Sequence, residues 1–172
     1  MDGKLIYNQK KIPKEQWRYG FRSSAATGCG WIATYNALRL MGYEADQQEL
    51  IRFYERQLPL IHGNCGTMTW APALYFRKQG FSVKLTANRS QFDRMGKESD
   101  VCLLFYWWRS KKALGAHFVA VQHTDRGFVG YNTFANSARP DFYGESLDAF
   151  LKRKRYFGCV LTGICKKGRG GT

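Results

Sequence analysis

The pattern of apolar residues changes character between the two halves of the sequence. In the first half, apolar residues recur at helical spacing in three segments, 29–41, 46–58 and 69–80. In the second half, continuous apolar runs of strand length take over, at 101–107, 116–123, 127–131 and 157–165. Helices followed by strands with tight turns are typical of an α+β fold. We therefore predict N-terminal helices packed on a C-terminal, mostly antiparallel sheet.

Capping residues mark where several of these helices begin and end. Gly42 is expected to end the first helix, and Asp46 with Glu49 forms a capping box for the second. Thr69 is expected to cap the third helix, with Pro72 in its first turn. Three shorter elements complete the prediction: a strand at 81–85, a short helix at 90–95 and a final helix at 146–154.

Length and composition favour one folded domain. The chain has 172 residues, of which 44% are hydrophobic, so it can bury a core. This hydrophobic fraction excludes a disordered chain despite the net charge of +14. We expect one domain over 1–172, with an extended N-terminal arm at 1–26 and a flexible basic tail at 166–172. No apolar run approaches the roughly 20 residues of a membrane span, and the N-terminus lacks a secretory signal pattern. We therefore expect a cytoplasmic protein.

The cysteines indicate neither a disulfide framework nor a metal site. There are five, an odd number, and no two are spaced as in a zinc motif: Cys29, Cys65, Cys102, Cys159 and Cys165. No phosphate-binding glycine loop is present either, so no cofactor is expected. Cys65, in a predicted loop, is the one rival of Cys29 as a reactive thiol.

The positive charge is concentrated in clusters at 10–11, 109–112, 152–155 and 166–169. No nucleic-acid motif accompanies them, so specific nucleic-acid binding is not expected, and solvated faces explain most of the charge. The net charge would favour acidic partners. We expect the loops 63–69 and 109–112 to line a cleft.

Three residues stand in an order that suits nucleophilic catalysis. Cys29 precedes the first helix, where the helix dipole favours a thiolate. His117 lies on a predicted strand after a polar loop, and Asn132 ends the next strand. A hairpin with its turn at 124–127 brings these two strands together, so that the Asn132 side-chain carbonyl could orient the imidazole. His123 lies too far along the strand to serve the same centre as His117.

The same residues resemble those of papain-like cysteine peptidases. The matching segments are Gly28-Cys29-Gly30-Trp31-Ile32-Ala33, then Ala116-His117-Phe118-Val119-Ala120-Val121, then Gly130-Tyr131-Asn132. The short spacing of His117 and Asn132, with a helix after it at Ser146, is similar to the bacterial double-glycine leader-peptidase type that processes bacteriocins. This resemblance implies a Cys29 nucleophile, a His117 base and an Asn132 orienter.

One feature departs from that family. Its members usually carry a glutamine shortly before the cysteine, which donates to the oxyanion, and Ser23 stands at that position here. Ser23, Ser24 or Arg22 could substitute for it. The helix start at Gly28, Gly30 and Trp31 is expected to complete the oxyanion and substrate-binding site, together with Ser23.

The resulting prediction is a thiol peptidase that acts on peptide or protein substrates through a thioester intermediate. Three alternatives remain at this level. A deamidase or transglutaminase-type acyltransferase would use the same residues on a side-chain amide. A weakly active or inactive peptide-binding module would explain the missing glutamine and the aromatic run 106–108. A nucleic-acid-associated protein would use the charge alone. The oligomeric state is left open.

Overall fold

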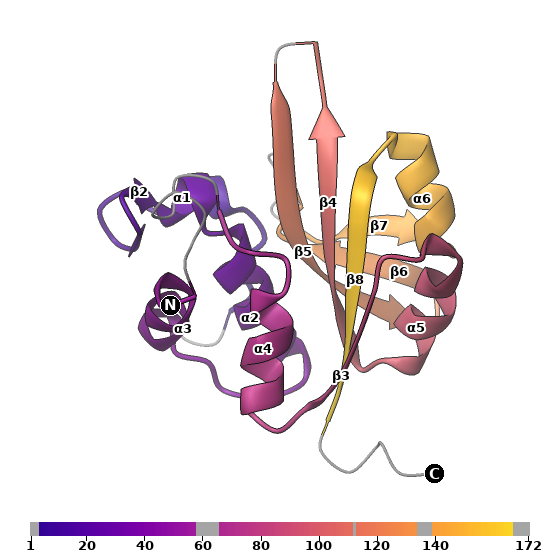
Figure 1. The fold of residues 1–172 in the computed structure, drawn as a ribbon, viewed down its shortest axis with the longest axis horizontal. Helices are drawn as coiled ribbons and strands as arrows, with labels where there is room; N and C mark the ends of the chain where they lie inside the picture. The colour runs from indigo at the N-terminus through magenta and orange to yellow at the C-terminus, as the bar shows by residue number, and fades with distance from the viewer. Residues whose placement is uncertain (1–3, 58–65, 112, 134–138, 167–172) are drawn as a thin grey trace.

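A computed structural model describes residues 4–57, 66–111, 113–133 and 139–166 (Figure 1). Its centre is a six-stranded sheet in the order β3-β8-β4-β5-β6-β7, in which all neighbours are antiparallel. The strands are β3 (Ser82–Thr86), β4 (Val101–Arg109), β5 (Leu114–Thr124), β6 (Gly127–Tyr131), β7 (Asp141–Gly144) and β8 (Phe157–Cys165). The predicted α+β class with an antiparallel sheet is confirmed.

Helices cover both faces of this sheet (Figure 1). On one face lie α2 (Cys29–Leu40), α3 (Gln47–Glu55) and α4 (Ala71–Lys78), and on the other lie α5 (Phe92–Glu98) and α6 (Leu147–Lys154). The smaller elements are η1 (Gln9–Lys11), β1 (Arg18–Tyr19), β2 (Arg22–Ser23), α1 (Ser24–Thr27) and η2 (Arg89–Gln91). The Cys65 and His62 side chains, with the rest of 58–65, lie outside the described residues.

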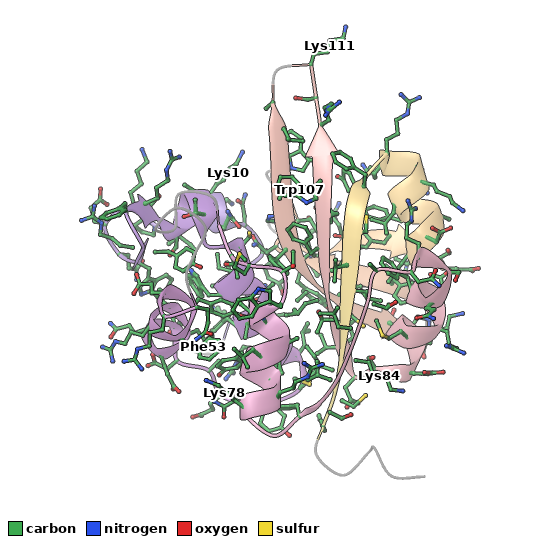
Figure 2. The ribbon with its side chains drawn as sticks, viewed as in Figure 1. Lys10, Phe53, Lys78, Lys84, Trp107 and Lys111 are labelled. Atoms are coloured by element: carbon green, nitrogen blue, oxygen red, sulfur yellow. The ribbon has the colours of Figure 1, made fainter. Side chains whose placement is uncertain are left out.

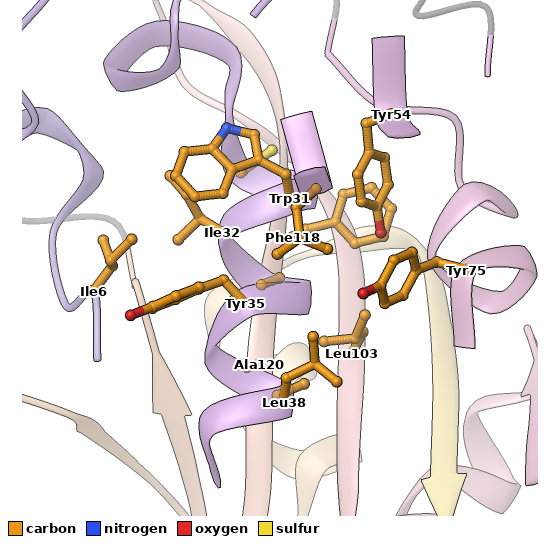
Figure 3. Close-up of a cluster of buried hydrophobic side chains, with 14 of the residues drawn as sticks. Ile6, Trp31, Ile32, Tyr35, Leu38, Tyr54, Tyr75, Leu103, Phe118 and Ala120 are labelled. Atoms are coloured by element: carbon orange, nitrogen blue, oxygen red, sulfur yellow. The ribbon is translucent and has the colours of Figure 1, made fainter. Parts of the chain in front are cut away.

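The two central strands are buried on both faces, which explains why their sequences are continuously apolar. Side chains of a strand alternate between faces, so Leu103 and Phe118 join the α2 core whereas Leu104 and Val119 join the α5–α6 core. Figure 3 shows the first of these cores, where α2 packs against β4 and β5. Because α2 is buried along most of its length, its first residue is held firmly against the sheet.

The capping predictions were right for α3 and wrong for α4. The Asp46 carboxylate accepts a hydrogen bond from the Glu49 N–H at 2.7 Å, as the capping box requires. Thr69 does not cap α4, which begins at Ala71 after Trp70. A cap at Thr69 would need the N–H of Ala71 or Pro72, but the former donates to Met68 and proline has none.

Residues 4–26 are more structured than an extended arm. Besides η1, β1, β2 and α1, they bury Ile6 and Trp17 in the core of the α2 face. The Asn36 side chain anchors this segment, because it accepts from the Ile6 N–H and donates to the Ile6 carbonyl, both at 2.8 Å. These elements are one turn or two residues long, too short to produce a sequence periodicity.

Within the described ranges, no helix is long and apolar enough to cross a bilayer. The same residues contain no group of three or more histidine, cysteine or carboxylate side chains placed to hold a metal ion.

Candidate active site

Cys29 is the first residue of α2 and lies against the middle of the sheet. Its side chain is only 9% exposed. Burial raises the pKa of its thiol to about 11, although hydrogen bonds from the backbone N–H groups of Phe118, Gly30 and Cys29 itself lower it. At neutral pH the resting group is therefore a thiol. The helix start does favour the thiolate, as expected, but the loss of water outweighs it.

The glycines on both sides of Cys29 serve the packing of the protein itself. A Cβ on Gly28 would lie within 3.0 Å of the Trp31 indole nitrogen, and a Cβ on Gly30 within 3.0 Å of the Thr67 side chain. Trp31 is fully buried, and its Nε1–H donates to Ser24 Oγ at 3.0 Å, which ties α2 to α1. These contacts fix the backbone on both sides of Cys29.

A buried tyrosine that the sequence analysis missed lies near Cys29. The Tyr19 hydroxyl hydrogen-bonds with Thr67 Oγ1 at 3.1 Å, and Thr67 in turn packs on Gly30. Burial raises the pKa of Tyr19 to about 12, and a charge on Cys29 would raise it further. Tyr19 therefore stays a neutral hydroxyl beside the thiol. It lies on the two-residue strand β1, for which the sequence has no periodic signal.

His117 lies on β5 and is 2% exposed. Its Nε2 lies 2.6 Å from the backbone oxygen of Asn132, and its ring meets Tyr106 edge-on with centroids 6.0 Å apart. A carbonyl oxygen can only accept, so the proton is on Nε2 and the lone pair is on Nδ1. Burial lowers the pKa of His117 to about 4, and the hydrogen bond to Asn132 offsets part of that shift. The imidazole is therefore neutral at pH 7.

Asn132 contacts His117 through its backbone carbonyl, whereas the sequence analysis expected the side-chain carbonyl to make this contact. Its backbone carbonyl accepts from the imidazole, whereas the side chain faces η1: Oδ1 accepts from the Gln9 N–H at 2.9 Å, and Nδ2 donates to Gln9 Oε1 at 3.0 Å. Asn132 has a φ of 64°, the left-handed conformation that asparagine tolerates. This twist directs the carbonyl and the side chain to different partners.

Gln9 is the second residue that the sequence analysis missed. It is 7% exposed, and its Nε2 donates to the Ala25 carbonyl of α1 at 3.2 Å. A cavity of about 170 Å³ opens beside it, between His117, Asn132 and Thr133 on one side and η1 and α1 on the other. In the sequence Gln9 stands in a polar, lysine-rich run, and nothing there marks it as buried.

The described residues of the basic loop, 109–111, do not line this cavity. Figure 2 shows Lys111 at the tip of the β4–β5 hairpin, pointing away from the body of the protein. The basic residue at the cavity is Lys10, from η1. Of the loop 63–69, only residues 66–69 are described, and none of these lines the cavity.

The structure brings Cys29, His117 and Asn132 to one region of β5. The thiol meets the N–H of Phe118, the residue that follows His117, and the imidazole reaches Asn132. Ser23 is the residue before α1, where its side chain caps no helix N–H, and it is partly exposed. The site thus joins a helix start, a central strand and the segment after β6.

Comparison with known proteins identifies the fold. No protein-family model matches the sequence, and no curated protein matches it significantly. Among solved structures, the chain is similar to the peptidase domain of Streptococcus ComA, described as a bi-functional ABC transporter involved in a quorum-sensing pathway. The likeness covers 80% of this chain and 91% of that one, with a TM-score of 0.52 and 11% identity. The chain therefore has the fold of a papain-like peptidase domain, as the resemblance of its motifs indicated.

Proposed function

We propose that this chain is a papain-like cysteine peptidase in which Cys29 is the nucleophile, His117 the general base and Asn132 the residue that orients the base. One observation carries the proposal: the His117 Nε2–H is held by Asn132 O at 2.6 Å, which leaves Nδ1 as the proton acceptor. His117 lies on β5, and the next residue of this strand, Phe118, contacts the Cys29 thiol through its N–H. The peptidase-domain fold supports the same assignment.

In the proposed mechanism the pair is neutral at rest, because burial raises the pKa of Cys29 and lowers that of His117. His117 Nδ1 takes the thiol proton as Sγ attacks the amide carbonyl carbon, and N–H groups at the start of α2 stabilise the oxyanion. The imidazolium then gives this proton to the departing amine, and a thioester remains on Cys29. Water hydrolyses the thioester, or a second amine captures it, as an acyltransferase would require.

We further propose that the substrates are peptides or proteins that carry acidic side chains. A second cavity, of about 310 Å³, shares Thr133 with the first, and Arg153 and Lys154 contribute to its wall. Asp141 also lines the second cavity, but Arg153 and Lys154 there, Lys10 at the first cavity and the net charge of +14 together favour anionic side chains. Charge reversal at Arg153 and Lys154 should lower kcat/KM for acidic peptides and spare neutral ones.

A specific observation favours a second candidate, a peptide-binding module without catalysis. Cys29 is buried, the pKa of its thiol is raised to about 11, and it does not line the cavity beside His117. Ser23 stands where the family carries an oxyanion-donating glutamine. A module of this kind would bind peptides in the cavities without cleaving them.

Labelling and cleavage decide between the two. The protein is incubated with a peptidyl epoxide, which alkylates catalytic thiolates, and with a pool of unstructured peptides that is read by mass spectrometry. We expect labelling of Cys29 and peptide cleavage, both lost in Cys29→Ala and in His117→Ala. Cys165→Ala, which removes a partly exposed thiol, is the matched control and should keep both. Peptide binding without labelling or cleavage would favour the module.

A further inference from the structure

We infer that Gln9 is a positioning residue for the catalytic base: its pairing with the Asn132 side chain holds Asn132 in the conformation that presents its carbonyl to His117. This inference rests on the proposed function, since it concerns the base of that reaction. It adds a residue from the N-terminal segment that none of the family motifs in this sequence contains.

The contacts between Gln9 and Asn132 form a closed pair. The Gln9 backbone N–H donates to Asn132 Oδ1 at 2.9 Å, while Asn132 Nδ2 donates to Gln9 Oε1 at 3.0 Å. Both residues are buried, at 7% and 2% exposure, so water cannot easily replace either bond. A buried amide group left without a partner pays a desolvation penalty, which favours the closed pair.

This pair matters to His117 because of the backbone conformation of Asn132. Asn132 is held at a φ of 64°, a left-handed conformation that asparagine tolerates but adopts at some cost relative to negative φ. The two bonds to Gln9 offset that cost. If they are lost, the backbone at Asn132 can relax toward negative φ, which rotates its carbonyl away from the imidazole.

The third bond of Gln9 connects the base to the nucleophile's side of the site. Gln9 Nε2 donates to the Ala25 carbonyl in α1, the helical turn directly before α2 and Cys29. One side chain therefore links the residue that orients His117 to the segment that leads into Cys29.

The test reads the tautomer of His117 by ¹⁵N NMR of its ring nitrogens, together with the His117 pKa. Gln9→Met keeps the length of the side chain and removes its bonds to Asn132 Nδ2 and to the Ala25 carbonyl, while the backbone N–H of residue 9 can still donate to Asn132 Oδ1. Gln9→Glu keeps an acceptor for Asn132 Nδ2 and loses the donor to Ala25. Gln16→Met, at an exposed glutamine of the same N-terminal segment, is the matched control.

We expect Gln9→Met to raise the population of the Nδ1–H tautomer roughly 2- to 10-fold, the equivalent of one lost net hydrogen bond. Gln9→Glu should keep most of the Nε2–H form, and Gln16→Met should keep all of it. In the active enzyme, Gln9→Met should lower kcat more than it changes KM, because the loss falls on proton transfer.

An unchanged tautomer and pKa of His117 in folded Gln9→Met would overturn the inference. Should Gln9→Met fail to fold, Asn132→Ala breaks the same pair from the other side and, unlike glycine, keeps a side chain that disfavours the φ of 64°. It should release the tautomer in the same way, and an unchanged tautomer there would equally overturn the inference. These readouts need no turnover, so they stand even if the chain proves to have no peptidase activity.

Discussion

His117 is held by the main chain of Asn132: its Nε2–H donates to the carbonyl oxygen at 2.6 Å, while the Asn132 side chain binds Gln9. A main-chain acceptor cannot be removed by substitution, but its direction depends on the backbone conformation at residue 132. The orientation of the His117 imidazole is therefore controlled by the φ of Asn132 rather than by the identity of one side chain.

Substitutions at Asn132 should reflect this control. Both Asn132→Gly and Asn132→Ala lose the bonds to Gln9, but only glycine adopts a φ of 64° without strain. We expect the alanine variant to be less stable than the glycine variant by about 1 kcal/mol in urea unfolding. The same pair of substitutions at Arg155, which has a φ of 56° at the end of α6, is the control and should show the same order. Equal stabilities of the two Asn132 variants would contradict the prediction.

The pH dependence of stability should report the buried neutral His117. Its pKa falls from 6.5 to about 4 on folding, so between these values the unfolded chain binds more protons than the folded one. The contribution of neutral His117 to the free energy of unfolding is complete above pH 6.5. It is lost as the pH falls to 4, by about 3 kcal/mol in total. Urea unfolding of wild type and His117→Gln across this range should show a steeper acid loss in wild type.

Parallel slopes for these two proteins would mean that His117 is not buried in its neutral form. His123→Gln, at an exposed histidine of the same strand, is the comparison variant for a histidine outside the site.

Alkylation rates should reveal the resting state of Cys29. With a pKa of about 11, the thiol at pH 7.5 forms on the order of 100-fold less thiolate than an ordinary cysteine, and it is also shielded. We expect iodoacetamide to modify the partly exposed Cys165 well before Cys29, as read by mass spectrometry of each site. In denaturant the two should react alike. Rapid modification of Cys29 below pH 8 would instead show a thiolate–imidazolium pair at rest.

Gly30 should not tolerate a side chain, although it lies in a helix. A Cβ there would come within 3.0 Å of the Thr67 Cβ and its substituents, so Gly30→Ala should destabilise the protein by about 1–3 kcal/mol despite alanine's better helix propensity. A double-mutant cycle with Thr67→Gly checks the cause. A cycle without coupling between the two positions would place the strain elsewhere.

Local patterns in the sequence were sufficient for the α+β class, for most strands and helices, and for the position of Cys29 at a helix start. These features depend on neighbouring residues, such as the capping box of Asp46 and Glu49 or the continuous apolar run of β4. Such signals are complete within a few residues of the chain, so they can be read without the fold.

Tertiary structure alone decided the hydrogen-bond partners and the burial of the candidate site residues. The bonds between Gln9 and Asn132 cross most of the chain, and the burial that raises the pKa of Cys29 comes from packing α2 on the sheet. Neither the solvent exposure of a group nor the choice between a backbone and a side-chain acceptor is encoded locally. Both depend on which distant segments exclude water from the site, and only the folded chain brings those segments together.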